Sequence, residues 1–177
     1  MNLICEDSDE LLDLVNEEDQ VIGCLERSKV YEKGLHNFRV INAFLINSQG
    51  QIWVPRRTAH KRLFSLHLDV SAGGHVASGE SYDDAFAREL EEELRLTPKD
   101  ITFKKVGCLT PHQHNVSAFM HVYTFLFDNV PNYNEMDFMQ YYWLSPAELL
   151  EKIEGDKAKG DLPILVERFL INNLSEN

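Results

Sequence analysis

The chain has 177 residues, which is enough for one domain with a full hydrophobic core. Its composition, 44% hydrophobic and 26% charged, is that of an ordinary soluble globular protein. The formal net charge of −12 argues against binding to nucleic-acid polymers or anionic membranes, because both need a basic surface.

The beginning of the chain and its cysteines indicate a cytoplasmic protein. The segment MNLICEDSDE is acidic, which is unlike a signal peptide, and no apolar run approaches the length of a membrane span. Cys5, Cys24 and Cys108 are scattered and lack Cys-x-x-Cys spacing. We therefore expect free thiols in a reducing compartment.

The first predicted elements are a small hairpin and a short helix. Strands over 11–15 and 21–25 flank the polar turn NEEDQ. A helix over 27–33 ends at Gly34, since glycine tolerates the left-handed geometry of a helix end. Residues 1–35 form an N-terminal extension in this interpretation.

A second hairpin and a basic cluster follow. The run FRVINAFLI at 38–46 is nearly continuous in apolar character, which predicts a buried strand. The turn NSQG leads to a returning strand over 52–54. Three cations come next in this very acidic chain: Arg56, Arg57 and Lys61. They either contact an anionic group of a ligand or balance surface charge.

The stretch from Gly73 to Leu96 carries the strongest chemical signal. Its glycines allow the backbone to approach a ligand closely. Ser81, followed three residues later by Asp84, predicts a helix start. Apolar residues then recur at every fourth position, which predicts a core-facing stripe: Tyr82, Phe86, Leu90 and Leu94.

Three glutamates lie beside that stripe. On a helix, Glu89, Glu92 and Glu93 fall within an arc of roughly 100°, whereas Glu91 points the other way. Three carboxylates on one face offer the hard oxygen ligands that Mg²⁺ prefers. A run of glutamates taken alone is more often a solvated acidic face, so the wider context decides between the two interpretations.

Strands and helices continue to the end of the chain. Strands are predicted over 101–109, 117–127 and 139–144, and helices over 147–153 and 162–174. The loop TPHQHN carries His112 and His114, for which contact with substrate or solvent is favoured over metal binding. The order of elements predicts a mixed sheet sandwiched between helices.

The spacing within the Gly73–Leu96 stretch resembles the Nudix box. Gly74, five residues, Glu80, seven residues, Arg88-Glu89-Leu90, one residue and Glu92-Glu93 match the family pattern, and Leu96 fills its last aliphatic position. Arg95 stands where the family usually has glycine. The resemblance implies an α+β fold, a Nudix-type α/β/α sandwich with a mixed central sheet, in a single domain over 1–177 with C-terminal helices over 145–177.

The segments VPRRTAHK and LDVSAGGHV, with the N-terminal hairpin, look like the subgroup related to isopentenyl-diphosphate isomerase. Those isomerases carry a catalytic cysteine just before the box glycine, where this chain has Gly73. They also place a catalytic glutamate on a later strand, and FMHVYTFLF contains none. The chain therefore resembles the isomerase branch in framework and the hydrolases in chemistry.

The resemblance implies a Mg²⁺- or Mn²⁺-dependent hydrolase that cleaves a diphosphate linkage in a nucleoside diphosphate derivative or similar small phosphorylated molecule. The implied metal ligands are the Gly74 carbonyl and the carboxylates of Glu89, Glu92 and Glu93, while Arg88 orients the box by pairing with carboxylates such as Glu80. The implied general base is Glu89, with Glu135 and Asp137 on a later loop as alternatives. Arg56, Arg57 and Lys61 would bind the substrate or support the fold.

The sequence is compatible with two other functions. One is isomerisation of isopentenyl diphosphate, and the other is a nucleotide-binding Nudix module without catalysis. A homodimer is compatible with the sequence, which does not identify the substrate.

Overall fold

The computed structural model describes residues 9–172. Its elements, in chain order, are β1 (Leu11–Val15), β2 (Val21–Glu26), α1 (Arg27–Glu32), β3 (Arg39–Ile46), β4 (Ile52–Arg57), β5 (Ala72–His75), α2 (Tyr82–Leu94), β6 (Thr102–Leu109), α3 (Pro111–His114), β7 (Phe119–Leu126), β8 (Phe138–Leu144), α4 (Pro146–Glu154), α5 (Leu162–Val166) and a π-helical turn η1 (Glu167–Ile171).

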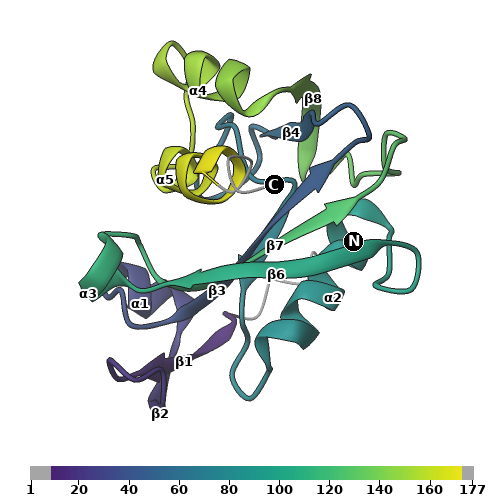
Figure 1. The fold of residues 1–177 in the computed structure, drawn as a ribbon. Coiled ribbons are helices and arrows are strands. Elements are labelled where there is room, and N and C mark those ends of the chain that lie inside the picture. The colour runs from purple at the N-terminus through teal and green to yellow at the C-terminus, as the bar shows by residue number, and fades with distance from the viewer. Residues whose placement is uncertain (1–8, 173–177) are drawn as a thin grey trace, which may run out of the picture.

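A mixed sheet of six strands forms the centre of the molecule (Figure 1). Five strands lie in the order β6-β7-β3-β4-β8, and β5 pairs with β3. The β3–β7 pair is parallel and the other pairs are antiparallel. Strand β3 divides one of its edges between two partners: residues 40–43 pair with β5, and Ile46 pairs with Ile52 of β4.

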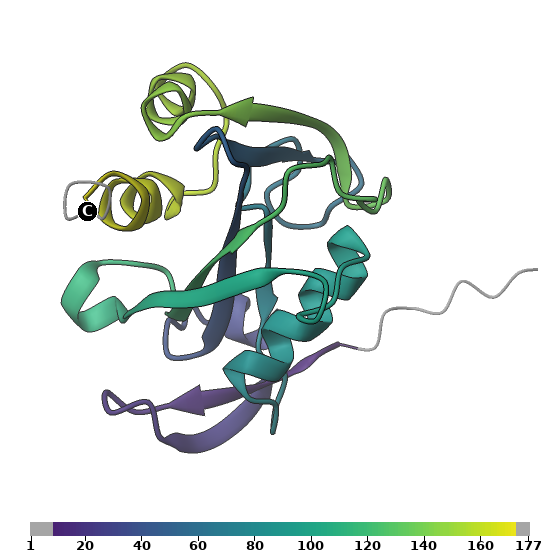
Figure 2. The same ribbon diagram turned by 45° about the vertical axis from the view of Figure 1, so that its right-hand side comes forward.

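Helices cover both faces of this sheet (Figure 2). Alternate residues of β3 point to opposite faces, as the period of two in a strand requires. Ile41, Ala43 and Leu45 pack with the α2 stripe, of which Phe86, Leu90 and Leu94 are buried. On the other face, Phe44 packs with Leu149 of α4 and with α5. The predicted sandwich of helices around a mixed central sheet is confirmed.

The N-terminal extension forms its own two-stranded sheet, β1–β2, followed by α1. A small core of Leu12, Val30, Phe38 and Ala118 attaches it to the domain. The carboxylate of Asp13 accepts hydrogen bonds from the Ser78 hydroxyl and the Gly79 N–H, at 2.6 and 3.0 Å. The extension is thereby fixed to the loop that precedes α2.

Several elements differ from the sequence-based expectations. Strand β4 extends to Arg57, beyond the predicted end at Val54, because it pairs with β8 along its whole length. The TPHQHN segment contains the short helix α3 rather than only a loop. The last predicted helix is divided into α5 and η1, and its expected end at Leu174 lies outside the described residues.

The connection 154–161, EGDKAKGD, is held by backbone hydrogen bonds. The N–H of Leu68 donates to the Lys157 carbonyl at 2.8 Å, and the N–H of Lys159 donates to the Leu68 carbonyl at 3.1 Å. The connection therefore has a defined position beside residues 66–69.

Two further expectations concern the whole chain. Among residues 9–172, no helix has the length and apolar character needed to cross a membrane. Cys24 and Cys108 are free and exposed, and Cys5 lies outside the described residues.

Candidate functional site

The helix that carries the glutamates begins and ends at defined caps. The Ser81 side chain accepts a hydrogen bond from the Asp84 N–H at 3.1 Å, which is the predicted N-cap. At the other end, Arg95 has φ 55° and ψ 33°, the left-handed conformation that glycine adopts most easily. Arg95 therefore occupies the conformation of the usual motif glycine with a side chain that resists it.

The absence of a side chain at Gly74 makes room for Glu89. A Cβ atom at position 74 would lie 2.0 Å from Oε1 of Glu89 and 2.4 Å from its Cδ. Glu89 and Glu93 are buried, whereas Glu92 and Glu91 are exposed. The Gly73 N–H donates to Oε2 of Glu93 at 2.9 Å. Strand β5 thus packs its two glycines directly against two of the three carboxylates.

Arg88 connects the carboxylates of the box. Its Nε and Nη2 donate to the two oxygens of Glu80 at 2.8 and 2.9 Å, a bidentate pair. Its Nη1 lies 2.7 Å from Oε1 of Glu89 and 3.5 Å from Oε2 of Glu92. Nη2 also donates to the His75 carbonyl at 2.9 Å, so Arg88 joins α2 to the end of β5.

The electrostatics of the buried carboxylates are unfavourable for negative charge. Burial raises the pKa of Glu89 to about 7, although the Arg88 charge acts in the opposite direction. Burial, and then the charge of Glu89, raise the pKa of Glu93 well above its ordinary value. At both carboxylates, burial outweighs the contacts with Arg88 and the Gly73 N–H, so the pKa of each stays above its ordinary value.

The donors at this site fit a hard divalent cation in their chemistry. Carboxylate oxygens are the ligands that Mg²⁺ and Mn²⁺ favour, and a cation would compensate the buried charges. Among residues 9–172, no three His, Cys, Asp or Glu side chains gather closely enough to hold a metal ion. The carboxylates instead contact Arg88 and the Gly73 N–H, so a cation would compete with these contacts.

A cleft of about 1000 Å³ opens beside these glutamates. Its walls come from the N-terminal extension, the end of β4 with residues 60–64, strands β3 and β5, helix α2, and residues 159–162. Glu89, Glu92 and Glu93 line it, together with Arg88 and Gly74. The predicted metal ligands therefore share one cleft.

Two of the three predicted substrate-binding cations also line this cleft. Nη1 of Arg57 lies 2.7 Å from Oδ2 of the buried Asp69, whose Oδ1 lies 3.1 Å from Nζ of Lys159. Although burial alone would raise it, the charges of Lys159 and Arg57 hold the pKa of Asp69 below its ordinary value. Lys61 pairs with Asp137, and both line the cleft.

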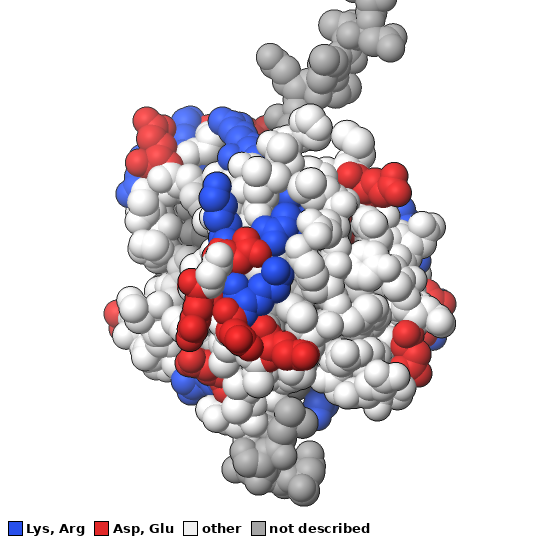
Figure 3. Space-filling view, turned by 90° about the horizontal axis from the view of Figure 1, so that it is seen from above, with Lys and Arg blue, Asp and Glu red and all other residues white. Residues whose placement is uncertain are grey.

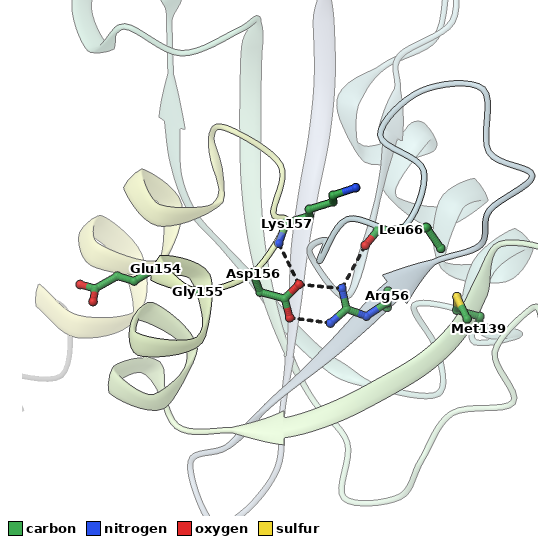
Figure 4. Close-up of a pocket in the computed structure, with 7 residues that line it drawn as sticks. All are labelled: Arg56, Leu66, Met139, Glu154, Gly155, Asp156 and Lys157. Atoms are coloured by element: carbon green, nitrogen blue, oxygen red, sulfur yellow. Dashed lines mark hydrogen bonds and ion pairs between the residues drawn. The ribbon is translucent and has the colours of Figure 1, made fainter.

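Arg56 is placed elsewhere. Its Nη1 and Nη2 donate to the two oxygens of Asp156, the former at 3.0 Å, and Nη1 also donates to the Leu66 carbonyl at 3.0 Å (Figure 4). On the surface at the α4 end of the molecule, acidic and basic side chains lie intermixed (Figure 3). Arg56 does not line the glutamate cleft, and its contacts tie β4 to the connection after α4.

The remaining candidates divide in the same way. Asp137 lines the cleft, whereas Glu135 is exposed and is not part of its lining. His112 packs against Phe119, and Nδ1 of His114 accepts from the Thr110 N–H at 2.9 Å. Neither histidine lines the cleft, so the structure separates both from the glutamates.

Asn42, Asp69 and Lys159 are among the cleft residues that sequence reasoning missed. Lys159 lies 90 positions after Asp69, and no fixed spacing links them to the box. The apolar surroundings of Asn42 in FRVINAFLI were the one local signal, since a lone amide within a buried strand calls for a partner.

The fold and the site together define an α/β/α sandwich with a cleft lined by carboxylates from one helix. The NUDIX domain model matches residues 36–163, and the chain belongs to the Nudix hydrolase family. An uncharacterized Nudix hydrolase from Nostoc sp. PCC 7120 is 52% identical over 92% of this chain and 97% of its own length. A Nudix hydrolase from Deinococcus radiodurans is 46% identical over 91% of this chain and 94% of its own length.

The crystal structure of DR0079 from Deinococcus radiodurans is similar to this chain, with a TM-score of 0.85 and 45% identity. It covers 90% of this chain and 99% of its own. A more distant relative is an isopentenyl-diphosphate Delta-isomerase from Kocuria rhizophila, 25% identical over 80% of this chain and 81% of its own. The resemblance to the isomerase-like subgroup agrees with this relative.

Proposed function

We propose that the chain is a Mg²⁺- or Mn²⁺-dependent hydrolase of a diphosphate linkage, acting on a nucleoside diphosphate derivative or a similar organic diphosphate. One observation carries the proposal: two buried carboxylates with raised pKa values share a cleft with several cations. A divalent cation would satisfy the carboxylates, and the cations suit an anionic substrate.

The proposed metal-holding groups are Glu89, Glu92, Glu93 and the Gly74 carbonyl. When bound, the cation supplies charge neutralisation at phosphate oxygens and lowers the pKa of a water molecule. Arg88 orients Glu89 through the contact at 2.7 Å and is itself fixed by Glu80.

Glu89 is the proposed general base. It lines the cleft beside Glu92 and Glu93, and its contact with Arg88 at 2.7 Å orients its carboxylate. Asp137 is the alternative from the later loop, because it lines the cleft, whereas Glu135 does not. Arg57 and Lys61 are the proposed substrate-binding cations, and Lys159 joins them through Asp69. Arg56 is proposed to support the fold through its ion pair with Asp156 rather than to bind substrate.

Isomerisation of isopentenyl diphosphate is the weaker candidate. A Cβ atom at Gly73 would lie 2.9 Å from the Ile41 carbonyl oxygen and 2.9 Å from Cγ2 of Val70. The position of the isomerase cysteine is therefore too crowded for a side chain in this structure. Proton exchange into isopentenyl diphosphate in D₂O would support the isomerase activity.

The test of the hydrolase is a phosphate-release screen with and without Mg²⁺. The substrates are nucleotide sugars, dinucleoside polyphosphates, nucleoside triphosphates and prenyl diphosphates. We expect Mg²⁺-dependent turnover of at least one class, and a loss of at least about a hundredfold in kcat in the Glu92→Gln, Glu93→Gln double variant.

Glu91→Gln is the matched control, since Glu91 is exposed and does not line the cleft. It should retain the activity of the unmodified protein. No turnover across the panel, or full activity in the double variant, contradicts the proposal. Binding of a nucleotide without turnover, unaffected by neutralising the three glutamates, would instead favour a non-catalytic binding module.

We also propose that the protein is cytoplasmic. The free thiols of Cys24 and Cys108 support this, because reduced cysteines are typical of that compartment.

A further inference from the structure

Asn42 is a polar residue on an apolar face of the sheet. It lies on β3, where it pairs with Val122 on one side and with Gly73 on the other. Only 6% of its surface is exposed. The face that it shares with Phe44 is otherwise part of the apolar core beneath α4 and α5. An amide at such a position needs hydrogen-bond partners, because burying it without them costs stability.

The protein provides only a weak partner for this amide. Its Nδ2 donates to Sδ of Met120 at 3.5 Å, and a thioether is a poor acceptor. No residue among 9–172 makes a hydrogen bond to its Oδ1. Asn42 thus retains both a donor and an acceptor.

Asn42 also lines the cleft that contains the glutamates. The cleft is apolar around it, with lining from Val40, Val70, Met120, Leu162 and Leu165. Gly73 lies between Asn42 and the carboxylates: its N–H donates to Glu93, and a Cβ atom on it would lie 3.4 Å from Oδ1 of Asn42. This apolar part of the cleft, the apolar chamber, is therefore continuous with the site of the proposed chemistry.

We propose that Asn42 determines substrate specificity by hydrogen bonding to an uncharged donor-and-acceptor group of the substrate. The apolar chamber disfavours a phosphate, which is better served by Arg57 and Lys159. It also leaves the amide unsatisfied when a hydrocarbon chain enters. A planar group with its own donor and acceptor, such as the edge of a heterocyclic base, satisfies both requirements. This inference rests on the proposed function of the cleft.

The test compares the binding of three probes by calorimetry in the presence of Mg²⁺. Methylenediphosphonate reports on the phosphate and metal site alone. The α,β-methylene diphosphates of adenosine, guanosine, cytidine and uridine add a base, and isopentenyl methylenediphosphonate adds a hydrocarbon chain. We expect at least one nucleoside probe to bind about tenfold more tightly than methylenediphosphonate, and more tightly than the isopentenyl probe.

The decisive variant is Asn42→Ala, which removes the amide without filling the chamber. We expect its affinity for the preferred nucleoside probe to fall about tenfold. Its affinity for methylenediphosphonate should be unchanged, and its affinity for the isopentenyl probe should be unchanged or higher. If this variant does not fold, Asn42→Leu, which refills the space with apolar atoms, gives the same comparison of probes. Thr124→Ala is the matched control, because Thr124 is also a buried polar residue but does not line the cleft.

Several results would overturn the inference. Unchanged nucleoside affinity in the Asn42 variant, or a preference of the unmodified protein for the isopentenyl probe, would each do so. A lower midpoint of urea unfolding with unchanged affinities would make Asn42 a structural residue. Binding of methylenediphosphonate with no gain from any base would overturn this inference alone, whereas binding of none of the probes would also overturn the proposed function.

Discussion

At the scale of single residues, Gly74 shows how an absent side chain positions a present one. The carboxylate of Glu89 occupies the space that a Cβ atom at position 74 would need. Glu89 can contact Arg88 and line the cleft only while that space is empty. The φ angle of Gly74 is not positive, so its backbone conformation does not call for glycine. Glycine is needed at this position because it leaves room for the Glu89 carboxylate.

The first prediction concerns Gly74→Ala. We expect the added methyl group to displace the Glu89 carboxylate and to weaken Mn²⁺ binding by about tenfold or more, as loss of support for a metal ligand typically does. Calorimetric titration with Mn²⁺ measures this. Gly23→Ala is the control, because a Cβ atom at Gly23 meets nothing within 4 Å. Equal Mn²⁺ affinities in the two variants would contradict the prediction.

The second prediction concerns the pH dependence of stability that Glu89 causes. Burial raises the pKa of Glu89 from its ordinary value of 4.5 to about 7 in the folded protein. Between pH 4.5 and about 7, the folded state binds a proton that the unfolded chain has released. The contribution of Glu89 to the free energy of unfolding therefore falls as pH rises through this range, and the loss is complete above it. Below pH 4.5 the effect is absent.

Urea unfolding of the metal-free protein and of Glu89→Gln tests this dependence. The free energy of unfolding of the variant minus that of the unmodified protein should be larger at pH 8 than at pH 4.5, because glutamine carries no charge to desolvate. A stability difference that is independent of pH would mean that Glu89 does not have a raised pKa in the folded state.

At the scale of elements, the end of α2 shows a local conflict. Arg95 takes the left-handed backbone conformation, and its N–H donates to the Glu91 carbonyl at 3.1 Å. A non-glycine residue pays a steric penalty there, which the long-range packing of Leu94 and Leu96 offsets. The helix therefore ends where the family motif ends it, in spite of the residue at that position.

We predict that Arg95→Gly raises the free energy of unfolding by about 0.5–1 kcal/mol, since glycine relieves this penalty. Arg95→Ala is the control, because alanine keeps the Cβ atom and the conflict. Urea unfolding of both variants provides the measurement. A gain of similar size in Arg95→Ala would attribute the effect to charge or side-chain loss rather than to backbone conformation.

Which of Arg56 and Arg57 faces the cleft could not be predicted from the sequence. The N-cap and apolar stripe of α2 depend on residues three or four positions apart, so they could be predicted together with the sandwich of helices and sheet. The two arginines depend on the extent of β4, which is set by pairing with β8 about 85 positions later. Adjacent strand residues point in opposite directions, and the longer strand sends only Arg57 into the cleft.

Long-range contacts also explain what the sequence could not show about the site. Lys159 reaches Asp69 because residues 157–159 pair with Leu68, and no local pattern indicates that pairing. The glutamates lie on one helix, so their common face follows from helical periodicity alone. Their degree of burial does not, because it depends on how β5 packs against α2.

At the scale of the whole molecule, binding of the proposed metal should add to the free energy of unfolding. A ligand that binds only the folded state at 100 times its Kd adds about 2.7 kcal/mol to the free energy of unfolding. We therefore expect saturating Mg²⁺ to raise the Tm by about 5–10 °C at pH 8, for a chain of this size. The shift should be smaller at pH 5, because there a proton competes with the cation for the Glu89 carboxylate.

Differential scanning calorimetry measures this shift, and the Glu92→Gln, Glu93→Gln double variant is its control. The double variant should show little response to Mg²⁺. An equal rise of Tm in both proteins would assign the stabilisation to ionic strength or to a site elsewhere.

The divided edge of β3 has a consequence for how such a protein acquires new substrates. Strands β4 and β5 share the edge of β3 and then separate, and the cleft opens where they part. On one side of it lie the glutamates of α2, and on the other lies a rim of connecting segments. The rim consists of the N-terminal extension, the connection between β4 and β5, and residues 159–161. These segments contribute no strand to the six-stranded sheet. Changes in the length or sequence of these segments would therefore alter the rim of the cleft and leave the sheet and the glutamates of α2 in place.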